Sequence, residues 1–208
     1  MTFDEYRINY WRMFLVLEKE LVEALDYVEL NTNNYATTSI MFSKLLLSIG
    51  AEIDNVFREC SGLTGRSNIG DYYKFIIKRY PQIVNQQVKV KDTAIILKPY
   101  DGWNESKPAQ SLLFWEKYNE LKHDRVLNAQ NASLETVLNA LAGLFVMELY
   151  RFDDIYKTHG DTFTNIPNDG FESKLFVLNA WDKKMRFSKV KLDYSLYDEE
   201  SGIHDFKL

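Results

Sequence analysis

The 208-residue sequence has one cysteine, only four prolines and nine glycines, and no long apolar run. A single cysteine, Cys60, excludes an intrachain disulfide and any cysteine-rich metal site. The longest apolar segment, residues 137–147, is interrupted by Asn139 and falls well short of the roughly 20 residues that cross a bilayer. Residues 1–5 are acidic and carry no signal-peptide run. We therefore expect a cytoplasmic protein with no membrane partner.

An excess of basic residues is also missing. Lysine and arginine total 25 against 30 aspartates and glutamates, which gives a net charge of −5. This balance argues against broad electrostatic binding of nucleic acid but leaves room for a local basic patch. The apolar fraction of 46% and the aromatic fraction of 14% predict a folded domain with an aromatic-rich core.

Several familiar site motifs do not occur. The chain lacks a phosphate-binding glycine-rich loop, a Gly-x-Ser-x-Gly elbow and a His-Glu-x-x-His helix. Glu120 and His123 form one Glu-x-x-His unit, but a di-metal bundle needs two such units. The second is absent, because Arg151 follows Glu148 at the third position. We therefore expect no metal and no cofactor.

Apolar residues recur at helical spacing along most of the chain. Polar caps, glycines and prolines divide this pattern into segments. The expected helices are residues 3–30, a helix from 37–39 to Gly62, residues 69–80, a helix after Pro108 with Ser111 near its N-cap, and a helix capped by Ser133 that runs through Ile155.

One internal segment follows a different period. Residues 87–91 alternate apolar and polar side chains between Pro81 and Pro99, which is typical of a hairpin or an extended excursion. The fold class expected is a mainly α bundle of about five helices over residues 1–160, with a small β insertion at residues 82–107. Residues 161–208 would form a short β or irregular appendage, either packed on the bundle or partly mobile.

Three glutamates lie on or beside the apolar stripes of their helices: Glu18, Glu52 and Glu148. A buried carboxylate must find a partner or reach water. The ordinary explanation is a salt-bridged or snorkelled glutamate at a helix crossing.

Residues 115–125 hold the most reactive combination of side chains in the chain. Asn119 and His123 are four apart and share a helix face. Histidine can transfer a proton near neutral pH, and Lys122 and Arg125 can hold a phosphate. Together these are the components of a metal-independent RNA-cleaving site, in which a ribose 2′-hydroxyl attacks the adjacent phosphate. Alternatively, Asn119 and His123 brace the bundle as buried polar groups.

Three stretches resemble the HEPN superfamily of small helical bundles: residues 39–54, residues 118–123 and residues 139–144. The resemblance covers about residues 37–157. It implies a ribonuclease of a toxin–antitoxin, abortive-infection or phage-defence system that acts as a homodimer, with its site at the shared interface. The partners implied are RNA or a nucleotide and an antitoxin or other protein.

The family's motif is an arginine, often followed by Asn, Asp or His, with a histidine four to six residues beyond the arginine. Asn119 and His123 match its second and last positions, whereas Tyr118 stands where the arginine belongs. Tyrosine cannot supply the missing cation. The alternative to a ribonuclease is therefore a non-catalytic HEPN-like module that binds a nucleotide, RNA or a partner protein.

In the catalytic interpretation, each residue of the site has a role. His123 would act as general base or acid, and Asn119 would position the reacting groups. Lys122 or Arg125 would stabilise the phosphate, and Glu52 would orient a cation or the histidine. Arg125 can converge on His123 only if the helix ends near His123, since otherwise the two side chains project in roughly opposite directions.

Overall fold

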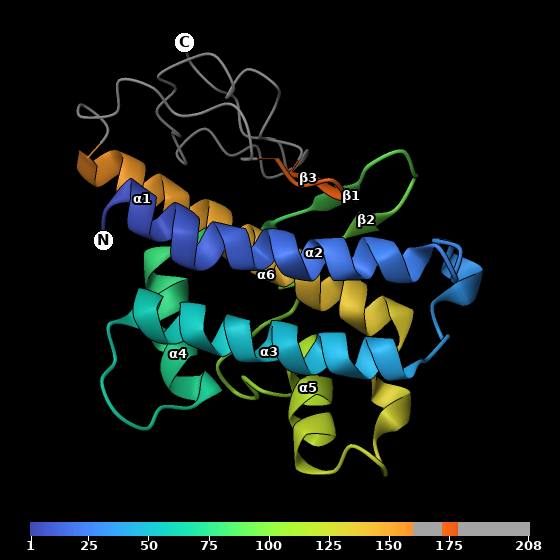
Figure 1. The fold of residues 1–208 in the computed structure, drawn as a ribbon. Coiled ribbons are helices and arrows are strands. Elements are labelled where there is room, and N and C mark those ends of the chain that lie inside the picture. Colours follow the sequence, from blue (N-terminus) through green and yellow to red (C-terminus); the bar gives the residue numbers. More distant parts are fainter. Residues whose placement is uncertain (160–171, 179–208) are drawn as a thin grey trace.

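The computed structural model describes residues 1–159 and 172–178, and it is mainly helical with one small sheet (Figure 1). This confirms the predicted fold class. The elements are α1 (Phe3–Tyr6), η1 (Arg7–Trp11), α2 (Arg12–Leu25), η2 (Thr32–Asn34), α3 (Ile40–Ser61), α4 (Ile69–Arg79), η3 (Pro81–Asn85), β1 (Val88–Val90), β2 (Ile96–Leu97), α5 (Leu113–His123), η4 (Ala129–Asn131), α6 (Leu134–His159) and β3 (Phe176–Leu178).

The first three elements form one continuous helix, because the backbone stays helical where α1 meets η1 and where η1 meets α2. Thr2 and Glu5 form a capping box at its start. The middle section, η1, is a π-helical turn. The helix ends at Leu25, before the predicted residue 30. Just beyond it, the Asn34 side chain donates to the carbonyl of Glu29, a local bond that competes with further helix.

Local signals set most of the other helix boundaries. The Ser39 hydroxyl accepts the Phe42 N–H at 3.0 Å at the start of α3, and Gly62 ends that helix with φ +66°. Ser133 caps α6 by accepting the Thr136 N–H. The helix predicted after Pro108, α5, has Leu112 as its N-cap, next to Ser111. Within the described residues no side chain caps it, and the Ser111 hydroxyl donates to the Lys107 carbonyl.

Helix α3 lies at the centre of the bundle. It packs most extensively along α6 and also contacts α2, α4 and α5 (Figure 1). The buried side chains of all these helices form a single core that is rich in aromatic rings. Within the described residues, no helix is long and apolar enough to span a bilayer.

The sheet joins two distant parts of the chain. β1 pairs antiparallel with β2 on one side and with β3 on the other, so the predicted β insertion is extended by a strand from the C-terminal segment. Apart from residues 172–178, the predicted appendage lies outside the described residues.

Glu18 anchors this C-terminal strand. Its carboxylate, almost fully buried, accepts hydrogen bonds from the Ser173 hydroxyl and from the N–H groups of Lys174 and Leu175 at 2.9 and 3.0 Å. The carboxylate thus has its partners in the backbone that leads into β3. This explains how a glutamate can occupy an apolar stripe of α2.

Candidate functional site

The reactive stretch lies at the C-terminal end of α5. The helix ends at His123, and Asp124 has the extended backbone angles φ −146° and ψ 95°. The Asn128 side chain donates to the carbonyls of Glu120 and Asp124 at 3.0 Å, which closes the helix end. Because the helix ends at His123, Arg125 does not follow the helical direction, which would point its side chain away from His123.

The cationic side chains of this stretch face solvent. Lys122, His123 and Arg125 are exposed, and Asn119 is half-buried one turn before His123. Asn119 makes no side-chain hydrogen bond to any described residue, so its amide is available to a ligand. The described residues therefore do not support the bracing role for His123, because an exposed side chain braces nothing in its own chain.

Tyr118 belongs to the core and not to the surface site. It is 3% exposed, and its ring centroid lies 5.4 Å from that of Trp115. It also fills the space above Gly50 of α3, where an added Cβ would come within 2.2 Å of the ring. The Lys122 ammonium lies 5.4 Å from the Tyr118 ring centroid, a cation–π distance. A cation, Lys122, therefore lies beside the Tyr118 ring one helical turn later.

Glu52 does not share this surface. Gly50 faces Tyr118 of α5, and two helical residues further on the side-chain direction has turned by roughly 200°. Glu52 therefore points to the other side of α3, where it is 7% exposed and lies within electrostatic range of Arg151. The structure brings Asn119, Lys122, His123 and Arg125 into one region and leaves Glu52 out of it.

A polar cluster lies between η1, α3 and α6, with two members buried and the other two partly open to solvent. We call it the Arg151 cluster, and its members are Tyr10, Glu59, Glu148 and Arg151. Arg151 is 3% exposed, forms an ion pair with Glu59 and stacks on the Tyr10 ring at 3.8 Å. This cluster was not predicted from the sequence, although the position of Glu148 in an apolar stripe indicates a buried carboxylate.

Glu148 carries the largest electrostatic perturbation in this cluster. It is fully buried, and neither carboxylate oxygen has a hydrogen-bond partner among the described residues. Desolvation raises its pKa to about 8, opposed by the nearby Arg151 charge. Tyr6 donates to the main-chain carbonyl of Glu148 at 2.8 Å and leaves the carboxyl group itself unbonded. Glu148 is therefore mainly protonated at neutral pH.

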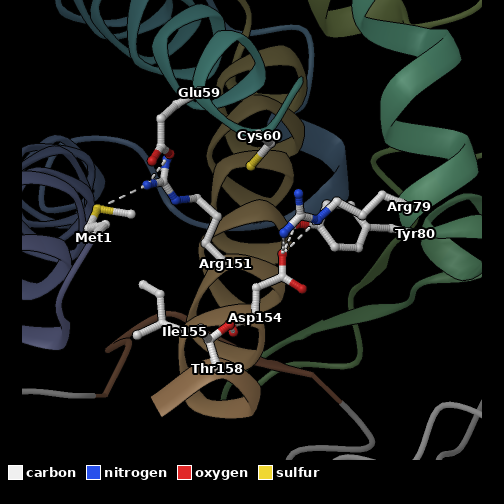
Figure 2. Close-up of a pocket in the computed structure, with 9 residues that line it drawn as sticks. All are labelled: Met1, Glu59, Cys60, Arg79, Tyr80, Arg151, Asp154, Ile155 and Thr158. Carbon is white, nitrogen blue, oxygen red and sulfur yellow. Dashed lines mark hydrogen bonds and ion pairs between the residues drawn. The ribbon is translucent and has the colours of Figure 1, made fainter. Parts of the chain in front are cut away.

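Arg151 also lines a small pocket of about 160 Å³ near the C-terminal end of α6 (Figure 2). On the opposite wall, Arg79 and Tyr80 both bond to Asp154. Figure 2 shows the two ion pairs on either side of the Cys60 thiol. Burial raises the pKa of Cys60 to about 12, so the thiol stays protonated and is a poor nucleophile. Each guanidinium in the pocket is paired with a carboxylate, so the charges balance. The Arg79–Asp154 pair connects α4 to α6, and the Arg151–Glu59 pair connects α6 to α3.

A larger pocket, of about 570 Å³, lies on the other side of Glu59. We call it the Glu52 pocket. The π-helical turn η1 contributes Asn9 and Tyr10, and α3 contributes Glu52, Asn55 and Arg58. Short π-helical insertions are frequent at functional sites because they shift side chains out of the normal helical register.

Within residues 1–159 and 172–178, no group of three or more His, Cys, Asp or Glu side chains is arranged to hold a metal ion. At the α5 end, an imidazole is a group that can transfer protons, and lysine and arginine are groups that can stabilise negative charge. No family model, curated protein or solved structure matches the chain.

Proposed function

We propose that the chain binds RNA at the end of α5 and cleaves it without a metal ion. One observation carries this proposal: α5 ends at His123, which leaves Lys122, His123 and Arg125 exposed beside the half-buried amide of Asn119. The two cations suit phosphate groups, and the imidazole suits proton transfer. The resemblance to HEPN proteins adds a context of phage defence or of a toxin–antitoxin pair.

The reaction would proceed by attack of a ribose 2′-oxygen on the neighbouring phosphorus. His123 accepts the proton of that hydroxyl as the new P–O bond forms. The bond from phosphorus to the 5′-oxygen breaks, and the leaving oxygen takes up a proton from an imidazolium or from water. Lys122 and Arg125 offset the charge that develops on the phosphate, and Asn119 orients it. The products are a cyclic phosphate and a 5′-hydroxyl.

A homodimer is part of the proposal, because the site is open in a single chain. Val126 and Leu127, directly after the cationic stretch, are 81% and 72% exposed. Exposed apolar side chains beside a polar site are typical of a surface that a partner covers. A second copy would supply a facing His123, so that one imidazole could act as base and the other as acid.

The competing proposal is a non-catalytic HEPN-like module that binds RNA, a nucleotide or a partner protein. Two observations favour it. Tyr118 occupies the core at the motif's arginine position, and the net charge of the chain is −5. In this case the exposed cations would hold a phosphate that is never cleaved.

Incubation of the purified full chain with total RNA in EDTA tests both proposals. We expect the wild type to release cyclic-phosphate ends and His123→Ala to lose at least about 100-fold in rate, the usual contribution of a general acid or base. Lys19→Ala, which removes an exposed lysine from α2, is the control and should cleave normally.

A measurement of RNA affinity for the same variants separates the two functions. Equal and absent cleavage by wild type and His123→Ala would refute the ribonuclease proposal. If RNA affinity then fell in Lys122→Ala with Arg125→Ala but not in Lys19→Ala, the non-catalytic module would be supported. RNA affinity that none of these substitutions changes would refute the α5 end as the binding site.

A further inference from the structure

We propose that the Glu52 pocket is a second binding site, independent of the α5 end, that takes a small organic cation with an ammonium or guanidinium group. The pocket holds about 570 Å³, which is within the range of roughly 300–1,000 Å³ found for small-molecule sites. It lies between the π-helical turn η1 and the C-terminal half of α3.

The central observation is that the Glu52 carboxylate has few hydrogen-bond partners. Glu52 is 7% exposed and lines the pocket, but within residues 1–159 and 172–178 its one hydrogen bond comes from the Asn55 amide at 3.3 Å. No cation among the described residues forms an ion pair with it. An ionised carboxylate can accept several hydrogen bonds, so Glu52 keeps acceptor capacity for a ligand in the pocket. A ligand cation would supply the missing partner.

The neighbouring cations are already engaged. Arg58 pairs with Asp54 at 2.6 Å, and Arg151 pairs with Glu59. Among the described residues that line the pocket, Glu52 and Glu59 are acidic and Arg58 is the single basic residue, which leaves one negative charge to be balanced. An anionic ligand would find no unpaired cation among the described lining residues, whereas a cationic ligand would offset the negative charge.

The remaining lining groups suit an organic cation better than a metal ion. The Asn9 and Asn55 amides and the Thr64 hydroxyl offer neutral acceptors and donors, and Tyr10 offers an aromatic ring. The described residues place no metal-binding group of three carboxylates, histidines or cysteines here. Desolvation raises the pKa of Glu52, so binding of a cation would favour the ionised form and release a proton.

Titration calorimetry of the full chain with agmatine and putrescine tests this site, with neutral 1,4-butanediol as the uncharged control. We expect submillimolar binding of at least one of the two cations, tighter at pH 8 than at pH 5, and none of the diol. Glu52→Gln should weaken binding by about tenfold or more. Glu23→Gln, the same change at an exposed residue of α2, should bind as the wild type does.

Urea denaturation separates a binding role from a structural one. Because Glu52→Gln removes a buried charge without changing the side-chain shape, we expect equal or higher stability together with the loss of binding. Three results would overturn the proposal: no binding of either cation at millimolar concentrations, unchanged binding by Glu52→Gln, or an equal loss in Glu23→Gln. Absence of RNA cleavage would leave this site unaffected.

Discussion

The end of α5 and the Arg151 cluster place similar residue types in opposite surroundings. At the end of α5, Lys122, His123 and Arg125 are exposed and can exchange water for a ligand. In the cluster, Arg151 is buried, forms an ion pair with Glu59 and stacks on the Tyr10 ring. The comparison teaches that reactive residue types indicate a site only when their packing leaves them free, whereas buried charges chiefly decide stability.

The largest effect is expected from removing the buried cation. Arg151→Met removes the ion pair with Glu59 and the stacking on Tyr10, so we expect the free energy of unfolding to fall by about 2–3 kcal/mol. Arg125→Met removes an exposed cation and should change it by less than about 0.5 kcal/mol. Urea denaturation at pH 7 measures both. Equal changes in the free energy of unfolding for the two variants would show that burial does not distinguish the two arginines.

The next effect depends on pH. Glu148 has a pKa of about 8 in the folded chain and about 4.5 when unfolded, with Tyr6, Glu52, Glu59 and Arg151 acting on it. Between these values the native state holds a proton that the unfolded state has released. The free energy of unfolding should therefore fall as pH rises from about 4.5 to about 8, by a few kcal/mol in total.

Glu148→Gln tests this directly. Since glutamine keeps the shape but cannot ionise, the variant should lose most of this pH dependence and exceed the wild type in stability at pH 8.5. Urea denaturation at pH 5.5 and pH 8.5 provides the measurement. A wild type and variant with parallel pH profiles would show that Glu148 does not titrate in this range.

The smallest effect concerns the buried face of α5. In Gly50→Ala, the new Cβ would come within 2.2 Å of the Tyr118 ring. Overpacking should cost about 1–3 kcal/mol, reduced by about 1 kcal/mol through the better helix propensity of alanine. In a Tyr118→Leu background the same substitution should cost less, because the overlapping ring is gone. Equal costs in both backgrounds would contradict the close contact.

Much of the fold could be predicted because its signals are local. Ser39 and Ser133 cap helices with their own hydroxyls, and Gly62 ends α3 in a conformation that other residues avoid. Apolar spacing then predicts which face each helix buries. Ser111 lies next to the N-cap of α5 but does not cap it, because its hydroxyl donates to the Lys107 carbonyl and accepts the Asn104 N–H.

The sequence by itself determined the helices, their buried faces and the candidate residues at the end of α5. Only the tertiary structure decided which part of the chain each acid meets. Glu18 finds its partners 155–157 residues away, and Glu59 finds Arg151 across the bundle. Helical periodicity gives a direction within one element but carries no information about the element opposite, so the placement of Glu52 away from His123 could not be read from spacing.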